Sequence, residues 1–460
     1  MGLRVYNTLT RSKEDFMPRD EGQVSIYVCG VTPYDETHIG HARPSVVWDV
    51  IRKYLRKKGY KVVYVQNFTD VDDKIIARSA QLGISTGELS SKYIQDYLDA
   101  MEALGVAPAD HYPKVSQHID AIVAMVEHLI EQGFAYVVDG DVYFHVPAFS
   151  EYGKLSKQQL DELESGARID VSADKRNPLD FALWKKSSPD EPGWDSPWGY
   201  GRPGWHIECS AMSLKYLGAG FDFHGGGMDL VFPHHENEIA QSESHTGCTF
   251  ARYWLHNGLV TVNDEKMSKS LGNFLTVSTL LAKYHRELLR FYILSTHYRS
   301  PLEFNEEKIE EAKKGWQRLS ETYQRLASRY GGEEAKEPLP WAQEAFTEAM
   351  DDDFNTARAM AVCFDVVRYA NGPDCTEEAA AGAYAFLAEV AEGILGVVST
   401  DSQPMIDSGL SAELVELLLA VREQLRQEKN WRLSDLIRDE LAKLGIIVED
   451  TKEGSRWKMN

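Results

Sequence analysis

Two histidines three residues apart, His38 and His41, stand at the start of an expected helix with Gly40 between them. This spacing places both imidazoles on one side of the helix. A helix N-terminus also presents unpaired N–H groups and the positive end of the helix dipole, which together favour a phosphate group. Because Gly40 has no side chain, a nucleotide can approach the backbone closely. The pattern predicts a phosphate site, and the alternative is a pair of surface histidines.

A second group of candidate residues lies in NDEKMSKSLGN, residues 263–273. Two lysines and two serines surround a methionine, and the Leu-Gly-Asn that follows is typical of a loop. Lys266 and Lys269 would neutralise the charge that builds on a triphosphate. Ser268 and Ser270 would donate hydrogen bonds to it. Taken alone, the pattern favours a solvated lysine loop.

Four residues far apart in the chain offer ligands of the kinds that Zn²⁺ accepts, namely Cys29, Cys209, His234 and Glu238. His234 and Glu238 are four residues apart and share one helix face. Cys29 ends an expected strand of a parallel sheet, where ligands gather. The spacing contains no CxxC pair, so the alternative is two buried cysteines beside a helical His–Glu pair. His235 competes with His234 as the imidazole ligand.

The elements expected around these residues form a parallel α/β sheet. VSIYVC (24–29) is rich in β-formers and is followed by a turn, an amphipathic helix and the strand KVVYVQNF (61–68). A strand–helix–strand unit of this kind belongs to a parallel sheet that binds ligands at the carboxyl ends of its strands. The α/β pattern returns in residues 221–244 and near HNGLV.

The remaining segments follow other patterns. Residues 86–135 have helical periodicity, and AYVVDGDVYFHV (135–146) predicts a hairpin that turns at Asp139 and Gly140. Residues 147–200 are rich in Pro, Trp and Asp and lack a clear period, as expected of an insertion with long loops. Helices are expected at 306–330, 341–370, 376–397 and 411–428, with a linker at 399–409. The layout predicts a split α/β domain followed by helices.

The composition is typical of a globular protein, with 43% hydrophobic and 26% charged residues. No apolar run is long enough to cross a membrane, and the N-terminus lacks the apolar segment of a secretory signal. Five scattered cysteines do not suggest a disulfide framework, so a cytoplasmic location is expected. The net charge of −22 disfavours non-specific binding of nucleic acid, although RKYLRKKGYK (52–61) and the nearly neutral tail (422–460) allow a local RNA surface.

Together, the segments at 38–41 and 266–270 resemble the HIGH and KMSKS motifs of class I aminoacyl-tRNA synthetases. Their order, on opposite halves of a split α/β domain, makes the resemblance far more specific than either motif alone. Further segments are similar to those of the cysteinyl-tRNA synthetase family: YVCGVTPYDETHIGHAR, NFTDVDDKI, KRNPLDFALWK, PGWHIECSAM, GGGMDLVFPHHENEIAQ and MDDDFNTARA. The similarity extends over essentially the whole chain, including GIIVEDTKEGSRWK near the C-terminus.

The resemblance implies an α/β fold: a split Rossmann-type parallel-sheet catalytic domain with a connective insertion, then an all-α helical bundle and a small C-terminal domain. The implied parts are 1–85 and 201–260 for the two halves of the catalytic domain, 86–200 for the insertion, 261–306 for the KMSKS loop and stem-contact region, 307–400 for the anticodon-stem-binding bundle and 401–460 for anticodon recognition. We expect a monomer, because no segment resembles a dimerisation helix.

The resemblance also implies roles for individual residues. One zinc ion would be held by Cys29, Cys209, His234 and Glu238. ATP, with Mg²⁺, would be bound by Gly30, Thr32, His38, Gly40, His41, Lys266, Ser268 and Lys269, of which the catalytic residues are His38, His41, Lys266 and Lys269. The substrate would contact Thr69, Trp205 and Asp229, with core packing as the alternative for Trp205. The tRNA would contact Arg426, Trp431, Asp435 and Asp450, for which local structural roles are the alternative.

The implied reaction has two steps. L-Cysteine and ATP give cysteinyl-adenylate and pyrophosphate, and the cysteinyl group then moves to the 3′ end of a cysteine-specific tRNA. The zinc would bind the substrate sulfur as a thiolate and so reject serine. A pocket shaped by packing alone separates near-isosteres by only about 10–200-fold, and the chain leaves no obvious room for an editing domain.

Three other functions are compatible with parts of the pattern. A ligase that joins cysteine to an amino-sugar inositol, in low-molecular-weight thiol synthesis, would keep the active site but would not need residues 401–460. A catalytically silent RNA-binding or zinc-sensing paralogue should lack His41, Lys269 or a zinc ligand, and all of them are present. A small nucleotidylyltransferase that shares only the first motif would explain neither KMSKS nor the C-terminal helices.

Overall fold

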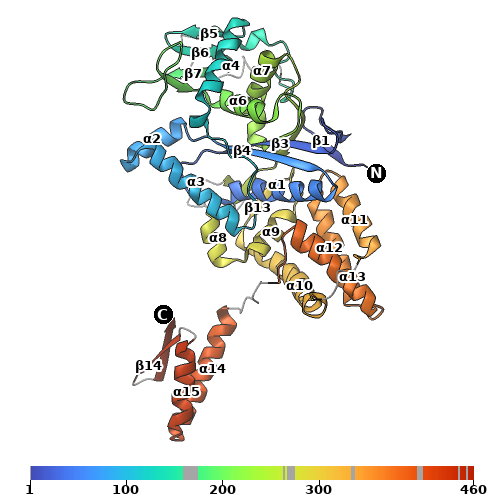
Figure 1. Ribbon diagram of the computed structural model, residues 1–460. Helices are drawn as coiled ribbons and strands as arrows, with labels where there is room; N and C mark the ends of the chain where they lie inside the picture. Colours follow the sequence, from blue (N-terminus) through green and yellow to red (C-terminus); the bar gives the residue numbers. More distant parts are fainter. Residues whose placement is uncertain are drawn as a thin grey trace. The chain divides into compact units, whose positions relative to one another are not determined.

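The computed structural model describes residues 2–158, 175–262, 265–266, 275–332, 337–400, 408–443, 446–451 and 454–459. It divides into two compact units, residues 1–400 and 401–460 (Figure 1). We describe each unit by itself. The sequence places a domain boundary at the same position, and the other expected boundaries stay predictions.

The central sheet of the first unit has four parallel strands in the order β10–β9–β3–β4. They are β3 (Gln23–Val31), β4 (Lys61–Phe68), β9 (Phe221–Gly227) and β10 (Ala251–Asn257). α1 (Ile39–Lys57) connects β3 to β4, and α7 (Glu236–Thr246) connects β9 to β10. The chain therefore leaves the adjacent strands β3 and β9 in opposite directions, which is the switch point at which parallel sheets bind ligands. The predicted parallel α/β sheet is confirmed.

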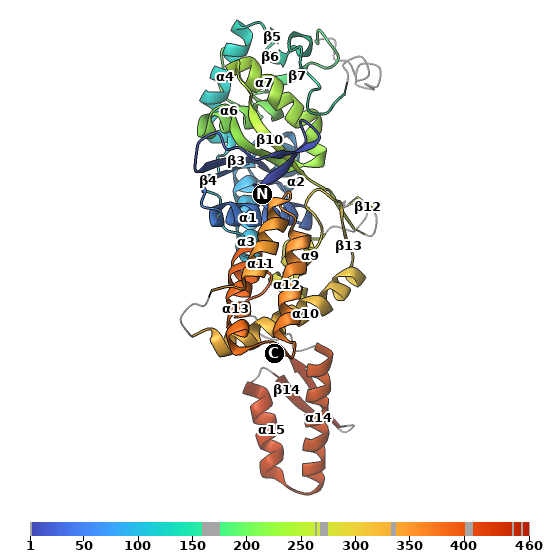
Figure 2. The same ribbon diagram turned by 90° about the vertical axis from the view of Figure 1, so that its right-hand side faces the viewer.

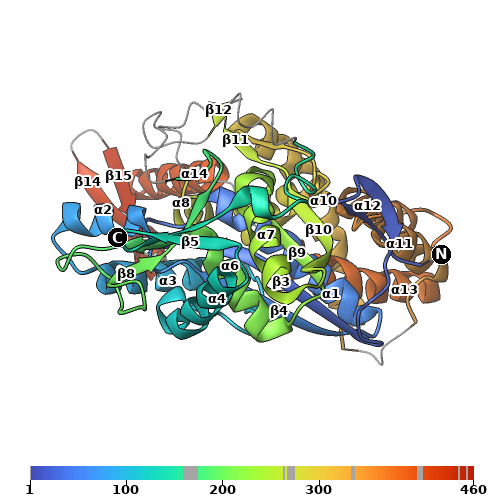
Figure 3. The same cartoon turned by 90° about the horizontal axis from the view of Figure 1, so that it is seen from above.

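Helices cover both faces of this sheet. α1 lies along one face, and α6 (Trp205–Leu217) lies with α7 on the other (Figures 1 and 2). Seen from above, the four strands lie side by side beneath α6 and α7 (Figure 3). Successive strand residues point to opposite faces, so Ile26 belongs to the core beneath α1 and Tyr27 to the core beneath α6. Both faces of the sheet are consequently buried.

Between β4 and α6 the chain forms a second sheet, which is antiparallel and ordered β5–β6–β7–β8. The elements of this part of the chain are α2 (Asp73–Leu82), α3 (Thr86–Ala103), α4 (Ile119–Glu131), β5 (Ala135–Val138), β6 (Asp141–Phe144), β7 (Phe181–Lys186) and β8 (Gly201–Pro203). The predicted hairpin is confirmed: Asp139 (φ 49°) and Gly140 (φ 95°) form the turn between β5 and β6.

The prediction of a continuous helix over 86–135 is wrong between α3 and α4. Residues 104–118 contain only a single short helical turn and run beside β4, where the N–H of Gln66 donates to the carbonyl of His111 (3.1 Å). A proline such as Pro113 cannot continue a helix. The segment also satisfies hydrogen-bonding groups at the edge of the sheet, which periodicity does not reveal.

The rest of the first unit is mainly helical. Its elements are the N-terminal hairpin β1 (Arg4–Asn7) and β2 (Ser12–Asp15), β11 (Val260–Val262), β12 (Glu265–Lys266), α8 (Val277–Lys283), α9 (Arg286–Leu294), β13 (Leu302–Phe304), α10 (Glu306–Tyr330), α11 (Pro340–Asp351), α12 (Thr356–Ala370) and α13 (Glu377–Leu387). A wider helical turn at Ala388–Ile394 continues α13. β11 lies between β12 and β13 in a small sheet.

The helix expected over 341–370 is two helices, α11 and α12. The chain turns between them at Asp353 (φ 64°) and Phe354 (φ 51°). The buried carboxylate of Asp353 accepts hydrogen bonds from the hydroxyl of Tyr298 (2.8 Å) and from Nε of Arg299 (2.7 Å). These tertiary contacts outweigh the local helical pattern.

The second unit packs two helices against a hairpin. Its elements are α14 (Ser408–Gln427), α15 (Trp431–Lys443), β14 (Ile446–Thr451) and β15 (Gly454–Met459). The small core contains Val415, Leu419, Leu441 and Ile446. None of the helices in the described ranges has the length and apolar composition needed to cross a bilayer.

A pair of glycine substitutions tests the packing of α1 on the sheet. A Cβ at Gly225 of β9 would lie 2.2 Å from a ring carbon of Trp48. Gly225→Ala should therefore lower the stability of the first unit by about 1–3 kcal/mol, because a buried indole must move. At Gly87 of α3 no atom lies within 4 Å of such a Cβ, so Gly87→Ala should leave stability unchanged or raise it by up to about 1 kcal/mol. Thermal unfolding followed by circular dichroism compares them; equal melting temperatures would contradict the packing.

Candidate active site

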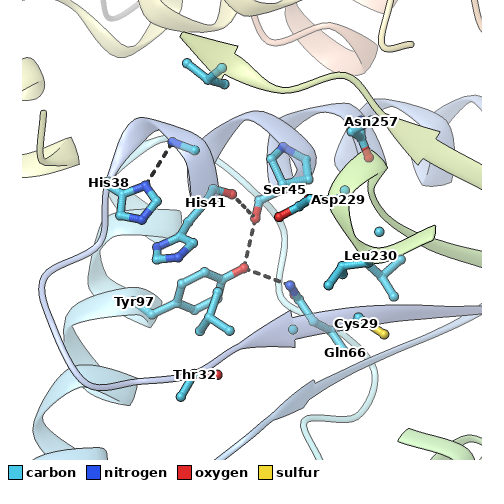
Figure 4. Close-up of a pocket in the computed structure, with 18 of the residues that line it drawn as sticks. Cys29, Thr32, His38, His41, Ser45, Gln66, Tyr97, Asp229, Leu230 and Asn257 are labelled. Carbon is cyan, nitrogen blue, oxygen red and sulfur yellow. Dashed lines mark hydrogen bonds between the residues drawn. The ribbon is translucent and has the colours of Figure 1, made fainter. Parts of the chain in front are cut away.

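A cleft of about 700 Å³ lies at the carboxyl ends of β3 and β9, at the switch point of the sheet. Its lining includes Cys29, Thr32, His38, His41, Asp229 and Asn257 (Figure 4). Gly30 and Gly40 line it as well. The structure thus brings the predicted phosphate site and one predicted metal ligand into one cleft.

The two histidines of the first motif stack on each other at the start of α1. Their ring centroids lie 3.7 Å apart with an interplanar angle of 26°. Nδ1 of His38 accepts a hydrogen bond from the N–H of Gly40 (3.1 Å), so a neutral His38 has its proton on Nε2 (Figure 4). Burial lowers the pKa of His38 to about 4. Burial, and then the neighbouring His38, hold the pKa of His41 well below its usual range. Both imidazoles are neutral at pH 7 and offer N–H donors to a phosphate.

Gly30 is required by the packing of two strands. Its N–H donates to Oδ1 of Asn67 (2.9 Å), and a Cβ at this position would lie 1.6 Å from the carbonyl oxygen of Asn67. Thr69 is buried beside Asn67, whose Nδ2 donates to its hydroxyl (3.3 Å). Thr32 lines the cleft, whereas Thr69 is not among the described residues that line it.

The four predicted metal ligands lie together. Sγ of Cys29 is 3.7 Å from Sγ of Cys209 and 3.4 Å from Oε1 of Glu238. Nε2 of His234 is 3.0 Å from the same Oε1. Ligands of a tetrahedral zinc ion are separated by roughly 3.4–3.8 Å, given Zn–S bonds of about 2.3 Å and Zn–N or Zn–O bonds of about 2.1 Å. The donor types and the two distances from Cys29 therefore fit a zinc ion, whereas His234 and Glu238 lie at hydrogen-bond distance and would have to separate slightly around a metal.

A second set of possible ligands shares two members with the first: Cys29, His224, His235 and Glu238. Nε2 of His224 lies 2.8 Å from Oε2 of Glu238, and Nε2 of His235 lies 3.4 Å from Sγ of Cys29. The competition between His234 and His235 expected from the sequence thus persists in space. The first set has two sulfur donors, which zinc prefers to a second imidazole in a site of this kind.

Charge in the cluster is balanced in spite of burial. Burial raises the pKa of the Glu238 carboxyl, but His224 and His234 outweigh this effect and hold that pKa well below its usual range. Burial lowers the pKa of His234, and Glu238 and Cys209 reverse this and raise it to about 10. A hydrogen bond from Cys29 lowers the pKa of Cys209 to about 6, whereas burial raises that of Cys29. A bound dication would replace protons in such a cluster.

The three predicted substrate residues occupy different surroundings. Trp205 is 41% exposed, and its ring centroid lies 4.4 Å from that of His234. Core packing, the alternative for Trp205, is therefore wrong. Asp229 lines the cleft, whereas Thr69 lies beside Asn67. Two of the three thus border the cleft or the metal cluster.

Sequence reasoning missed several residues that line the cleft. The hydroxyl of Tyr97 on α3 is 2.8 Å from Oγ of Ser45, and Nε2 of Gln66 donates to it (3.0 Å) (Figure 4). Asn257 ends β10 and is buried, and its Nδ2 has no partner in the described part of the chain. The rule that ligands gather at strand ends points to Gln66 and Asn257, but no sequence signal singles out Tyr97 within its helix.

The structure describes the other predicted residues only in part. The backbone of Lys266 belongs to β12, and Ser268 and Lys269 lie outside the described residues. In the second unit, Trp431 begins α15 and is 56% exposed, and Asp435 forms an ion pair with Arg438 (3.2 Å). Arg426 lies in the last turn of α14, and Asp450 pairs with Ser455 across the hairpin.

Comparison with known proteins relates the whole chain to one enzyme family. Residues 15–314 match the family model described as the tRNA synthetases class I (C) catalytic domain, residues 345–399 the DALR domain, and residues 407–457 the cysteinyl-tRNA ligase anticodon binding domain. The cysteine–tRNA ligase of Carboxydothermus hydrogenoformans is 53% identical over 464 residues, covering 99% of this chain and 100% of the relative. That of Heliobacterium modesticaldum is 51% identical and covers 100% of both chains.

Solved structures show the same fold at low identity. Mycobacterium tuberculosis methionyl-tRNA synthetase bound by methionyl-adenylate superposes with a TM-score of 0.61 at 15% identity, over 82% of this chain and 92% of that one. A putative arginyl-tRNA synthetase from Campylobacter jejuni gives 0.57 at 14% identity, over 84% and 96%. These two similarities concern the fold alone.

Single substitutions distinguish the two sets of possible metal ligands. Cys209→Ser and His234→Gln should weaken zinc retention by at least about tenfold, because each removes a donor of the two-sulfur set. His224→Gln and His235→Gln serve as matched controls and should lose less zinc than the first two variants, because in this set His224 and His235 only contact the ligands Glu238 and Cys29. Zinc content after dialysis against a chelator, measured by mass spectrometry on folded protein, gives the answer. Loss of zinc only in the two control variants would assign the metal to the other set.

Proposed function

The chain belongs to the cysteine–tRNA ligase family and is a class I aminoacyl-tRNA synthetase, and on this basis we propose how its residues perform the reaction. L-Cysteine is activated with Mg·ATP to cysteinyl-adenylate and pyrophosphate, and the cysteinyl group is then transferred to the 3′ end of a cysteine-specific tRNA. The observation that supports this assignment best is that one cleft contains Cys29, a member of the metal cluster, and the His38–His41 pair. The amino acid and the nucleotide are thus bound next to each other.

Cys29, Cys209, His234 and Glu238 would hold a zinc ion, and this site would distinguish cysteine from serine. When bound, the ion supplies a thiophilic Lewis acid that favours a thiolate over a hydroxyl. Of the four ligands, Cys29 is only partly buried and lines the cleft, whereas the other three are buried. A substrate side chain in the cleft would therefore reach the metal ligands from the side of Cys29. The exposed ring of Trp205 lies beside that of His234, with 4.4 Å between the ring centroids.

Activation depends on positioning and on charge stabilisation. A carboxylate oxygen of cysteine attacks the α-phosphorus, and the bond from that phosphorus to the departing pyrophosphate oxygen breaks. No side chain forms a bond to the substrate. His38 and His41 donate N–H groups to the phosphates from the start of α1, and Lys266 and Lys269 balance the negative charge that develops on the pyrophosphate. Asp229, in the wall of the cleft, binds the ammonium group or the ribose.

The second unit binds the tRNA. The exposed ring of Trp431 stacks on an unpaired base, and Arg426, Asp435 and Asp450 contact base edges. A ligase for an amino-sugar acceptor would have no use for such a unit, and the match of residues 407–457 to an anticodon-binding family favours tRNA as the acceptor. We also propose that the protein acts as a monomer in the cytoplasm.

The choice of acceptor tests this function directly. Purified protein is incubated with Mg·ATP and radiolabelled cysteine, together with total tRNA or with a glucosaminyl-inositol acceptor. Label should appear on tRNA alone, and labelled serine should not be transferred, because its hydroxyl is a poor zinc ligand. Label on the sugar alone would refute the role of the second unit and leave the activation chemistry intact.

Removal of residues 401–460 separates the two steps. Because the first unit has its own core and contains the whole cleft, the truncated chain should exchange pyrophosphate into ATP at a rate within about twofold of the full chain. Charging of tRNA should fall by at least about tenfold, since an interface of several base contacts is lost. Filter assays of both steps on the two proteins provide the comparison. Normal charging by the truncated chain would show that the second unit does not bind the tRNA.

A further inference from the structure

We propose that Arg43 is a positioning residue for ATP. Its guanidinium fastens to α1 the two chain segments that enter β11 and β13, and so sets the place of the Lys266 backbone, in β12, relative to His38 and His41. The inference rests on the proposed role of Lys266 and Lys269 in binding ATP. None of the expected site residues is Arg43, which lies two positions after the second histidine of the motif.

Arg43 is fully buried and bonds almost entirely to the backbone of other segments. The guanidinium donates to five carbonyl oxygens, through Nη1 to Gly258 (2.7 Å) and Leu259 (3.1 Å), and through Nη2 to His297 (3.3 Å), Tyr298 (3.4 Å) and Ser300. The first two carbonyls precede β11 and the other three precede β13. One side chain of α1 therefore joins both segments at the point where they enter the small sheet.

The positive charge of the guanidinium makes its hydrogen bonds to the carbonyl groups necessary. Burial lowers the pKa of Arg43 to about 10, so the guanidinium stays protonated at neutral pH. Its hydrogen-bond partners in the described residues are carbonyl oxygens, with no carboxylate among them. A buried cation that depends on carbonyl dipoles is stable only while those carbonyls keep their places. The guanidinium thus selects one arrangement of the two segments.

That arrangement extends to β12, which contains Lys266. Gly258 lies two residues before β11, and a Cβ there would be 2.3 Å from the carbonyl oxygen of Ser300, so the two segments touch. Within the small sheet, Val260 lies opposite Leu302 of β13, and Thr261 lies opposite Lys266 of β12. A shift of the chain at Gly258 is therefore passed by strand pairing to the backbone of Lys266.

The chain after residue 274 is also bonded to the start of α1. The N–H of Ile39 donates to the carbonyl of Leu275 (3.1 Å), and the N–H of Val277 donates to the carbonyl of Thr37 (2.8 Å). The described residues on both sides of 267–274 are thus tied to the first turns of the helix that presents the two histidines. The residues after 274 are bonded to the start of α1 through backbone hydrogen bonds. The residues before β11 are bonded to α1 through the side chain of Arg43.

The same helix provides a matched control. Arg52 is likewise buried, and its Nη atoms donate to the carbonyls of Ala107 (2.7 Å) and Pro108 (2.8 Å). Those carbonyls belong to the segment between α3 and α4, which does not lead to the lysines. Arg52 also donates to Oδ1 of Asp49 (3.4 Å), so Arg52→Lys removes buried hydrogen bonds of α1 without touching the entry to β11.

The experiment compares Arg43→Lys, Arg43→Met and Arg52→Lys in the full-length protein. Pyrophosphate exchange yields kcat and the KM values for ATP and cysteine, and thermal unfolding measures the structural cost. Arg43→Lys should lower kcat/KM for ATP by about 10-fold and Arg43→Met by about 100-fold, as expected of a displacement near 1 Å, while KM for cysteine changes less than about twofold. Arg52→Lys should lower the melting temperature to a similar degree and leave kcat/KM for ATP within about twofold.

Two outcomes would overturn the inference, and Lys269→Ala tells them apart. If Lys269→Ala impairs exchange but Arg43→Lys behaves like Arg52→Lys, Arg43 is only a structural residue and the proposed function stands. If Lys269→Ala leaves pyrophosphate exchange unchanged, the proposed role of the lysines in binding ATP is wrong, and the inference about Arg43 is wrong with it. The conservative Arg43→Lys decides the matter even if Arg43→Met does not fold.

Discussion

The pairing of β3 between β9 and β4 is the constraint on which the site depends. Because the three strands are parallel, their carboxyl ends meet at one edge of the sheet, and Cys29 lies there within ten residues of His38. Close packing leaves no room for side chains at two positions: Gly30 touches the backbone of Asn67 on the neighbouring strand, and Gly225 touches the ring of Trp48 on α1. The geometry of the cleft follows from backbone packing before any ligand is bound.

The metal cluster and the histidine pair at this site differ in charge. The metal cluster is buried and concentrates charge, with Glu238 held ionised by His224 and His234. The histidine pair instead loses its charge through burial. A phosphate therefore meets neutral N–H donors and the positive end of α1 rather than two imidazolium ions. The adjacent imidazoles can stack at 3.7 Å because neither ring is charged.

Local patterns predicted the parts of the fold that local physics determines. The run of β-formers at 61–68 is β4 with the expected bounds, and the i, i+4 spacing places His234 and Glu238 beside each other. Long-range contacts determine the rest. The helix breaks at Asp353 because side chains from a distant loop bond its carboxylate. The second ligand set around Glu238 of α7 arises because β9 brings His224 beside it. No spacing in the sequence records such contacts.

The second unit has a core of only a few apolar side chains among its described residues, including Val415 and Leu419, and it is compact by itself. A unit of about 60 residues buries a smaller share of its surface than a larger unit does and is only marginally stable, so this unit opens as a separate cooperative block at a lower free energy than the first. Unfolding of the protein is then not a single two-state event. A melting curve reports whichever block its spectroscopic probe senses, and the free-energy costs of substitutions in different blocks add independently.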